Sequence, residues 1–143
     1  MVNKIIDGIS IKINELFGDD YYIYSEEIEQ GFKEPCFFIS LLKPSSTPKL
    51  GTRSYREYNF DIHYFPKISN EKNYDMYDTN EKLIDGLEYI SVDGGLIRGS
   101  KIHSEIIDNV LHFFIKYSLF VIKEDVETEK MESLILKQNI KGW

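Results

Sequence analysis

Two histidines and a glutamate in the last third of the chain have side chains that could bind a divalent metal. The Asp108-Asn109 pair has the chemistry of a two-residue hairpin turn, and such a turn would place His112 opposite Glu105. Because side chains alternate along a strand, His103, Glu105 and His112 would then share one sheet face. Two imidazoles and a carboxylate suit a divalent transition metal.

A polar strand face without a metal is the interpretation that we favour for these three residues. The sequence lacks the short spacings of common metal motifs, because no histidine has another three or four residues away. Exposed strand histidines are more often solvated or paired with a neighbouring acid. We therefore expect no metal, no cofactor and no catalytic residue, and keep a small metal-binding enzyme as the alternative.

Other reactive residue types also lack the surroundings that catalysis needs. Cys36 is the single cysteine and lies in an apolar run after Pro35, so its thiol is expected to stay protonated and inert. The glycine-rich segment 93–95 has no Lys-Ser/Thr of a phosphate loop and reads as a hairpin turn. The sequence predicts a protein that is not an enzyme.

Arginine and tyrosine gather in one short segment, where Arg53, Tyr55 and Arg56 could stack on bases or grip phosphates. The neighbouring acids Glu57 and Asp61 weaken that interpretation. So does the net charge of −7, which comes from 17 basic and 24 acidic residues. Because tyrosine and arginine are enriched in protein interfaces, we predict a subunit or partner contact and no specific nucleic acid.

The chain length of 143 residues and its aromatic content of 14% predict one folded domain. No apolar run approaches the roughly 20 residues needed to span a membrane. The N-terminus lacks the apolar core of a signal peptide. The sequence therefore predicts a soluble, acidic protein with no membrane partner.

Hydrophobic periodicity predicts the elements of the first half. Apolar residues at helical spacing, followed by Gly18, predict a helix, and alternating or continuous apolar residues predict strands. A stretch rich in proline and serine predicts a loop. The predicted elements are a helix over 2–17, strands over 21–28, 36–42 and 53–65, and a loop over 43–51.

The second half predicts another helix and a hairpin. Ser69 could cap a helix over 70–90, and strands over 102–107 and 110–122 flank the second turn. That register pairs Ile106 with Leu111, Ser104 with Phe113 and Ile102 with Ile115. The predicted fold is a single α+β domain over 1–123, with a mainly antiparallel sheet and two helices packed on one face.

The last residues, 124–143, are predicted to be a C-terminal extension or docking arm. A charged stretch over 124–130 separates them from the preceding strand. Apolar residues then return, with Trp143 as a typical aromatic anchor. The arm either folds back on its own domain or docks on a neighbouring subunit or the sheath. The side chains predicted to dock are Met131, Leu134, Ile135 and Trp143.

Several segments together resemble a known family. They are the helix Ile5-Ile6-Asp7-Gly8-Ile9 leading into Leu16-Phe17-Gly18-Asp19-Asp20, then Gln30-Gly31-Phe32-Lys33-Glu34-Pro35-Cys36-Phe37-Phe38-Ile39, Asn59-Phe60-Asp61-Ile62-His63-Tyr64-Phe65-Pro66 and Val110-Leu111-His112-Phe113-Phe114. This series resembles the tail terminator proteins of clostridial contractile-tailed phages and R-type, phage-tail-like bacteriocins. The resemblance extends to about Lys123.

The resemblance implies a structural protein at the top of the tail of a phage or bacteriocin particle, assembled in the host cytoplasm. It implies a ring, usually a hexamer, that caps the tail tube and ends its growth. The implied partners are other copies of the chain, the tube protein, the sheath protein and a collar or neck protein. Another tail or neck completion protein of the same particle is the alternative.

Overall fold

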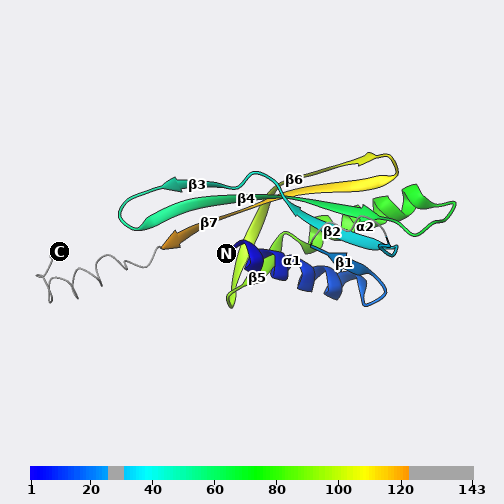
Figure 1. The fold of residues 1–143 in the computed structure, drawn as a ribbon, viewed down its shortest axis with the longest axis horizontal. Coiled ribbons are helices and arrows are strands. Elements are labelled where there is room, and N and C mark those ends of the chain that lie inside the picture. Colours follow the sequence, from blue (N-terminus) through cyan, green and yellow to red (C-terminus); the bar gives the residue numbers. More distant parts are fainter. Residues whose placement is uncertain (26–30, 123–143) are drawn as a thin grey trace, which may run out of the picture. The chain divides into compact units, whose positions relative to one another are not determined.

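Two helices and seven strands form residues 1–25 and 31–122, the part of the chain that the computed structural model describes (Figure 1). The helices are α1 (Val2–Phe17) and α2 (Lys72–Gly86). The strands are β1 (Tyr22–Tyr24), β2 (Cys36–Leu41), β3 (Ser45–Pro48), β4 (Arg53–Phe65), β5 (Tyr89–Val92), β6 (Gly95–Ile107) and β7 (Val110–Ile122).

The strands form one mostly antiparallel sheet in the order β1-β2-β4-β7-β6-β5, and β3 pairs with β4 beside this path. Strand β1 runs parallel to β2. The central strands β4 and β7 are distant in sequence, yet they are neighbours in the sheet. This adjacency decides which polar side chains meet.

Both helices pack on the same side of the sheet and bury its apolar face. Ile5, Ile9 and Ile13 of α1 recur every four residues and are fully buried, as a helical stripe requires. They share one core with Met76 and Leu83 of α2 and with alternate residues of β2, β4 and β7. The predicted α+β fold with helices on one face is therefore confirmed.

Two hydroxyl groups fix α2 and the segment after it to the sheet. Tyr64 Oη donates to Asp75 Oδ2 at 2.7 Å, and Tyr117 Oη donates to the Leu87 carbonyl at 2.6 Å. Both rings are almost fully buried. A buried hydroxyl without an acceptor would cost about 1–3 kcal/mol, so these bonds hold the helix in one position.

Two tight turns join the last three strands, as the sequence predicts. Asp93 and Gly94 have φ of 52° and 78°, and Asp108 and Asn109 have φ of 52° and 63°. Positive φ at both central positions matches the right-handed twist of the strands on either side. The second turn pairs Ile106 with Leu111 as predicted.

Ser104 also pairs with Phe113 as predicted, but the third predicted pair is interrupted. A bulge lies between Ser100 and His103, where Lys101 has φ of 51°. Two residues of β6 there oppose one residue of β7, so Ile102 and Ile115 are not a regular pair.

The segment predicted as a loop over 43–51 contains strand β3, so that prediction is wrong for Ser45–Pro48. All four residues are exposed, and an edge strand without a buried face shows no apolar alternation. Proline is tolerated in such an edge strand because the strand has no further neighbour that would need a hydrogen bond from a backbone N–H.

The predicted helix over 70–90 is shorter in the structure. It begins after Glu71, and Ser69 Oγ accepts a bond from the Glu71 backbone N–H instead of serving as the N-cap. The prediction also extended the helix through Ile90, but Tyr89–Val92 pair with β6 as a strand. Ile90 is buried in either conformation, so its burial alone did not distinguish a helix from a strand.

The described chain forms two compact units. The larger comprises Met1–Ser45 and Glu57–Leu119 and contains both helices. The smaller comprises Ser46–Arg56 and the chain from Phe120 onward, described as far as Ile122. None of the described helices is long and apolar enough to cross a membrane.

Candidate interaction surfaces and histidine cluster

The sheet of the larger unit has one side on which no described helix packs, which we call the open face. In β4 the buried Phe60 points toward the helices, so the adjacent Asp61 points away from them. The same alternation in β7 buries Phe113 and directs His112 to the side of Asp61. The open face therefore carries the polar side chains of these strands.

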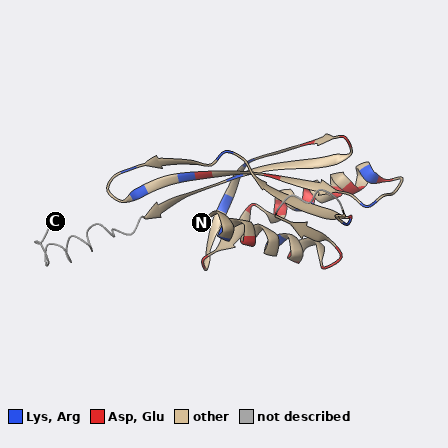
Figure 2. Cartoon of the chain, in the orientation of Figure 1, with Lys and Arg blue, Asp and Glu red and all other residues tan. Residues whose placement is uncertain are grey.

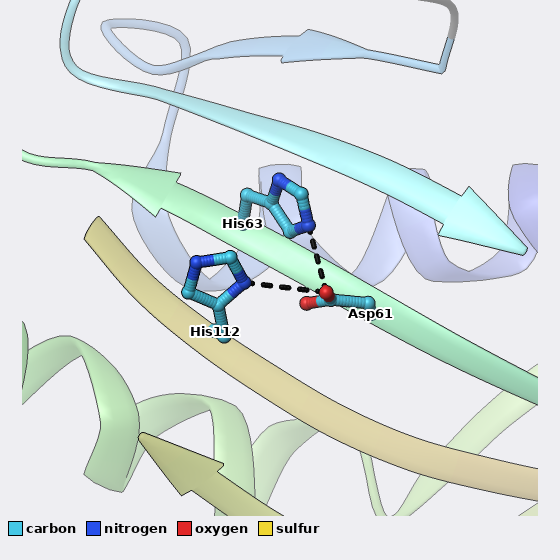
Figure 3. A group of neighbouring side chains, drawn as sticks. All are labelled: Asp61, His63 and His112. Atoms are coloured by element: carbon cyan, nitrogen blue, oxygen red, sulfur yellow. Dashed lines mark hydrogen bonds and ion pairs between the residues drawn. The ribbon is translucent and has the colours of Figure 1, made fainter. Parts of the chain in front are cut away.

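Asp61 joins two histidines on the open face, from two different strands (Figure 3). Its Oδ2 atom lies 2.8 Å from His63 Nε2 and 3.2 Å from His112 Nδ1. The two imidazole rings are themselves 4.4 Å apart, measured between centroids. We call these three residues the histidine cluster.

The carboxylate at the centre of the cluster is incompletely satisfied. Asp61 is only 9% exposed, and its Oδ1 atom is buried without a hydrogen-bond partner among the described residues. Leaving a buried acceptor unpaired costs about 1–3 kcal/mol, and more for a charged group. The cluster therefore holds a buried carboxylate oxygen whose charge a bound cation would compensate.

The metal ligands considered from the sequence do not come together as a group in the described structure. His103 stacks on Phe114 at 4.7 Å, and its Nδ1 lies 3.1 Å from the Lys101 carbonyl oxygen. Glu105 does lie opposite His112 in the register, as predicted, but the charged partner of His112 is Asp61.

Sequence reasoning missed Asp61 and His63 as partners of His112. Their spacing of two residues in an alternating strand did place them on one polar face. The missing information was the sheet order, because only the adjacency of β4 and β7 brings His112 beside them.

A groove of about 780 Å³ lies in the larger unit, and residues of β4, β6 and β7 line it together with the two residues that follow β2. Its walls combine apolar rings with two lysines. The lining includes Leu42, Lys43, Asn59, Lys101, His103 and Phe114.

An ion pair lies on the neighbouring part of the same strands. Lys116 Nζ donates to Glu57 Oε2, and Ser45 Oγ donates to Glu57 Oε1 at 3.4 Å. The bond from Lys116 holds the pKa of the Glu57 carboxyl below its ordinary value. This pair links β4 to β7 as the histidine cluster does.

The smaller unit carries the arginine and tyrosine predicted at an interface. The Arg53 guanidinium lies 4.8 Å from the Phe120 ring centroid, and the Tyr55 ring lies 5.2 Å from the same ring. Lys49, Leu50, Arg53 and Phe120 line a shallow cavity of about 430 Å³. We call these four residues and Tyr55 the basic patch.

The basic patch is open to solvent and contains two large apolar side chains. Leu50 is 88% exposed and Phe120 is 51% exposed. Sequence reasoning pointed to Arg53, Tyr55 and the segment 44–51, which holds Lys49 and Leu50, but missed Phe120, because Phe120 joins them only through the fold.

Arg56, the third predicted interface residue, has a different environment. It is half-buried, and its Nε atom is buried without a hydrogen-bond partner in the described residues. The predicted docking side chains Met131, Leu134, Ile135 and Trp143 lie outside the described residues.

Helix α2 offers a second surface, which is acidic and aromatic. Tyr74 and Tyr77 are 70% and 53% exposed, and their rings meet edge to face at 6.4 Å. Asp78, Glu81 and Asp85 are also exposed on this helix. Tyrosine contributes a large contact area at low entropic cost, so the two exposed rings suit a contact with another protein.

Comparison with protein families gives one match that spans most of the chain. The family described as phage tail terminator protein matches residues 4–129. Comparison with curated proteins gives no match.

Proposed function

Because the chain belongs to the phage tail terminator family, we propose that it closes the end of the tail as a ring of identical subunits. The family is structural rather than enzymatic, and it places this chain in the virion tail, where it ends tail assembly and contacts other tail proteins. The ring, its subunit number and its contact surfaces are our proposal.

The observation that carries the proposed ring is the separation of charge along the chain. Segment 46–56 contains three basic residues and no acid, although the chain as a whole has a net charge of −7. Segment 71–88, which contains α2, has six acids and two lysines, a net charge of −4. Figure 2 shows the basic positions at the start of β4 and the acidic positions along α2.

We infer that the basic patch of one subunit docks on the α2 surface of the next. Opposite charges steer such an encounter and fix its register. Exposed Leu50 and Phe120 on one side and exposed Tyr74 and Tyr77 on the other provide the apolar contact. Stacking on Phe120 holds the Arg53 guanidinium in place, which reduces the entropy lost on docking.

A contact between two different surfaces repeats from subunit to subunit and closes into a ring when the rotation permits. A hexamer is the subunit number that the family resemblance suggests. We propose that the ring caps the tube and meets the sheath and the collar or neck. We also propose that the extension over 124–143 docks on a neighbouring subunit or on the sheath.

Reversing charge at the proposed contact tests this arrangement in assembled particles. Arg53→Glu places a carboxylate opposite the acidic helix, and we expect at least about a tenfold loss of the chain from purified tails. Lys67→Glu makes the same charge change at an exposed position outside the patch and is the matched control. The copy number of the chain per tail, measured by quantitative mass spectrometry, gives the readout.

A charge swap then distinguishes a direct contact from a general effect of charge. Adding Asp78→Lys and Glu81→Lys to Arg53→Glu restores an attractive pair, so incorporation into tails should recover. Wild-type incorporation of Arg53→Glu, or an equal loss in Lys67→Glu, would show that the basic patch is not the subunit contact.

A further inference from the structure

We propose that Asp61, His63 and His112 form a binding site for a divalent first-row transition metal, with Zn²⁺ as the representative ion. The site lies on the open face of the sheet, and it does not depend on the proposed ring contact. It differs from the trio considered from the sequence, because only His112 belongs to both.

The ligand atoms are already close to the separations that a metal requires. The two histidine nitrogens and a carboxylate oxygen all lie within 4.8 Å of one another. With metal–ligand bonds of about 2.0–2.1 Å, tetrahedral ligands are about 3.3 Å apart. The contacts of 2.8 Å and 3.2 Å at Asp61 Oδ2 therefore need only small side-chain rotations to admit an ion.

The donor set and its exposure also suit such an ion. Two imidazoles and one carboxylate favour zinc, cobalt, nickel or iron over the all-oxygen sites of calcium and magnesium. The histidine side chains remain 28% and 20% exposed, so water can complete the coordination.

The buried Asp61 Oδ1 atom is the independent observation that points to a ligand. In a purely hydrogen-bonded cluster, both imidazole N–H groups donate to Oδ2, and Oδ1 keeps no partner among the described residues. A metal ion bound by the carboxylate compensates the charge that this buried oxygen carries. Unpaired buried polar atoms are rare in folded proteins and call for such an explanation.

Metal binding would join β4 to β7 at the centre of the sheet, since it takes two ligands from one strand and one from the other. Consider an ion that binds only the folded chain and is present at a free concentration of about 100 times its Kd. It shifts the folding equilibrium about 100-fold toward the folded state. Zinc should therefore raise the melting temperature of the protein.

The test is a zinc titration of the untagged full chain by calorimetry, with Co²⁺ absorption as a spectroscopic measure of coordination. We expect one equivalent of zinc per chain and a rise in melting temperature. His63→Ala and His112→Ala should each weaken zinc binding more than tenfold. Loss of a residue that only supports a metal ligand already lowers affinity about 10- to 100-fold, and each of these changes removes a ligand itself.

His103→Ala is the matched control, because His103 lies on the same face but stacks on Phe114. It should leave zinc affinity unchanged. If His112→Ala fails to fold, zinc affinity of His63→Ala and the cobalt spectrum of the wild-type chain test whether the cluster binds a metal. An absence of stoichiometric zinc binding would overturn the proposal, as would equal affinity in wild type and His63→Ala, or loss of binding in His103→Ala.

Discussion

At the scale of single residues, burial controls the chemistry of the reactive side chains. Cys36 is fully buried in β2, and burial together with the nearby Glu34 charge raises the pKa of its thiol to about 12. Desolvation also raises the pKa values of the Tyr64 and Tyr117 hydroxyls. These groups are therefore neutral near neutral pH and act in packing and hydrogen bonding.

Cys36 should consequently resist thiol reagents in the folded protein at pH 8. Only the thiolate reacts, and the folded chain keeps its thiol protonated well beyond the ordinary pKa of 9.0. Above that pH the unfolded chain loses a proton that the folded chain retains, so this group lowers stability as pH rises. Ellman's reagent measures the rate with and without denaturant; rapid labelling of the native protein would contradict the assigned burial.

The chemistry of individual residues could be predicted from the sequence where it depended on local context. The inert Cys36 followed from its apolar run, and Arg53 and Tyr55 were recognised from their types. The partners of His112 could not be predicted, because Asp61 lies 51 residues away and meets it only across the β4–β7 pair.

At the scale of secondary structure, helix α1 depends on a close approach to β5. Gly8 is buried on this helix, and a Cβ atom there would lie 2.7 Å from the Ser91 carbonyl oxygen and 3.4 Å from Ile90 Cδ1. The first contact involves backbone that cannot rotate away. Only glycine fits at this crossing without moving the helix.

Gly8→Ala should therefore destabilise the protein although alanine favours a helix. Overpacking costs about 1–3 kcal/mol, and helix propensity returns about 1 kcal/mol. Because the clash is with a backbone carbonyl, we take the upper end of that cost and expect a net loss of about 2 kcal/mol in the free energy of unfolding, measured by denaturant titration. Asn3→Ala, at an exposed position of the same helix, is the control and should be neutral or slightly stabilising. Equal stability of Gly8→Ala and wild type would refute the close packing.

Most elements could be predicted because their patterns are local. The apolar stripe of α1, the alternation of β4 and the Asp108-Asn109 turn each specify one structure. Strand β3 could not be predicted, since its exposed serines carry no pattern and only pairing with β4 makes it a strand. The end of α2 was missed for a related reason, because pairing with β6 decides the conformation of Tyr89–Val92.

At the scale of the whole molecule, the chain divides its charge between two segments of opposite sign. The basic segment 46–56 and the acidic segment 71–88 lie in different compact units. Together with exposed aromatic side chains on both, this charge pattern suits repeated contact between identical subunits. It also suits a family whose members act within the tail.

The measurement that tests the central claim most directly is the length of tails assembled without this chain. Electron micrographs of particles from cells lacking the intact gene should show tails of variable and excessive length, because nothing ends their growth. Supplying the wild-type chain should restore uniform length. Tails of normal, uniform length in the absence of the chain would contradict its role as the tail terminator.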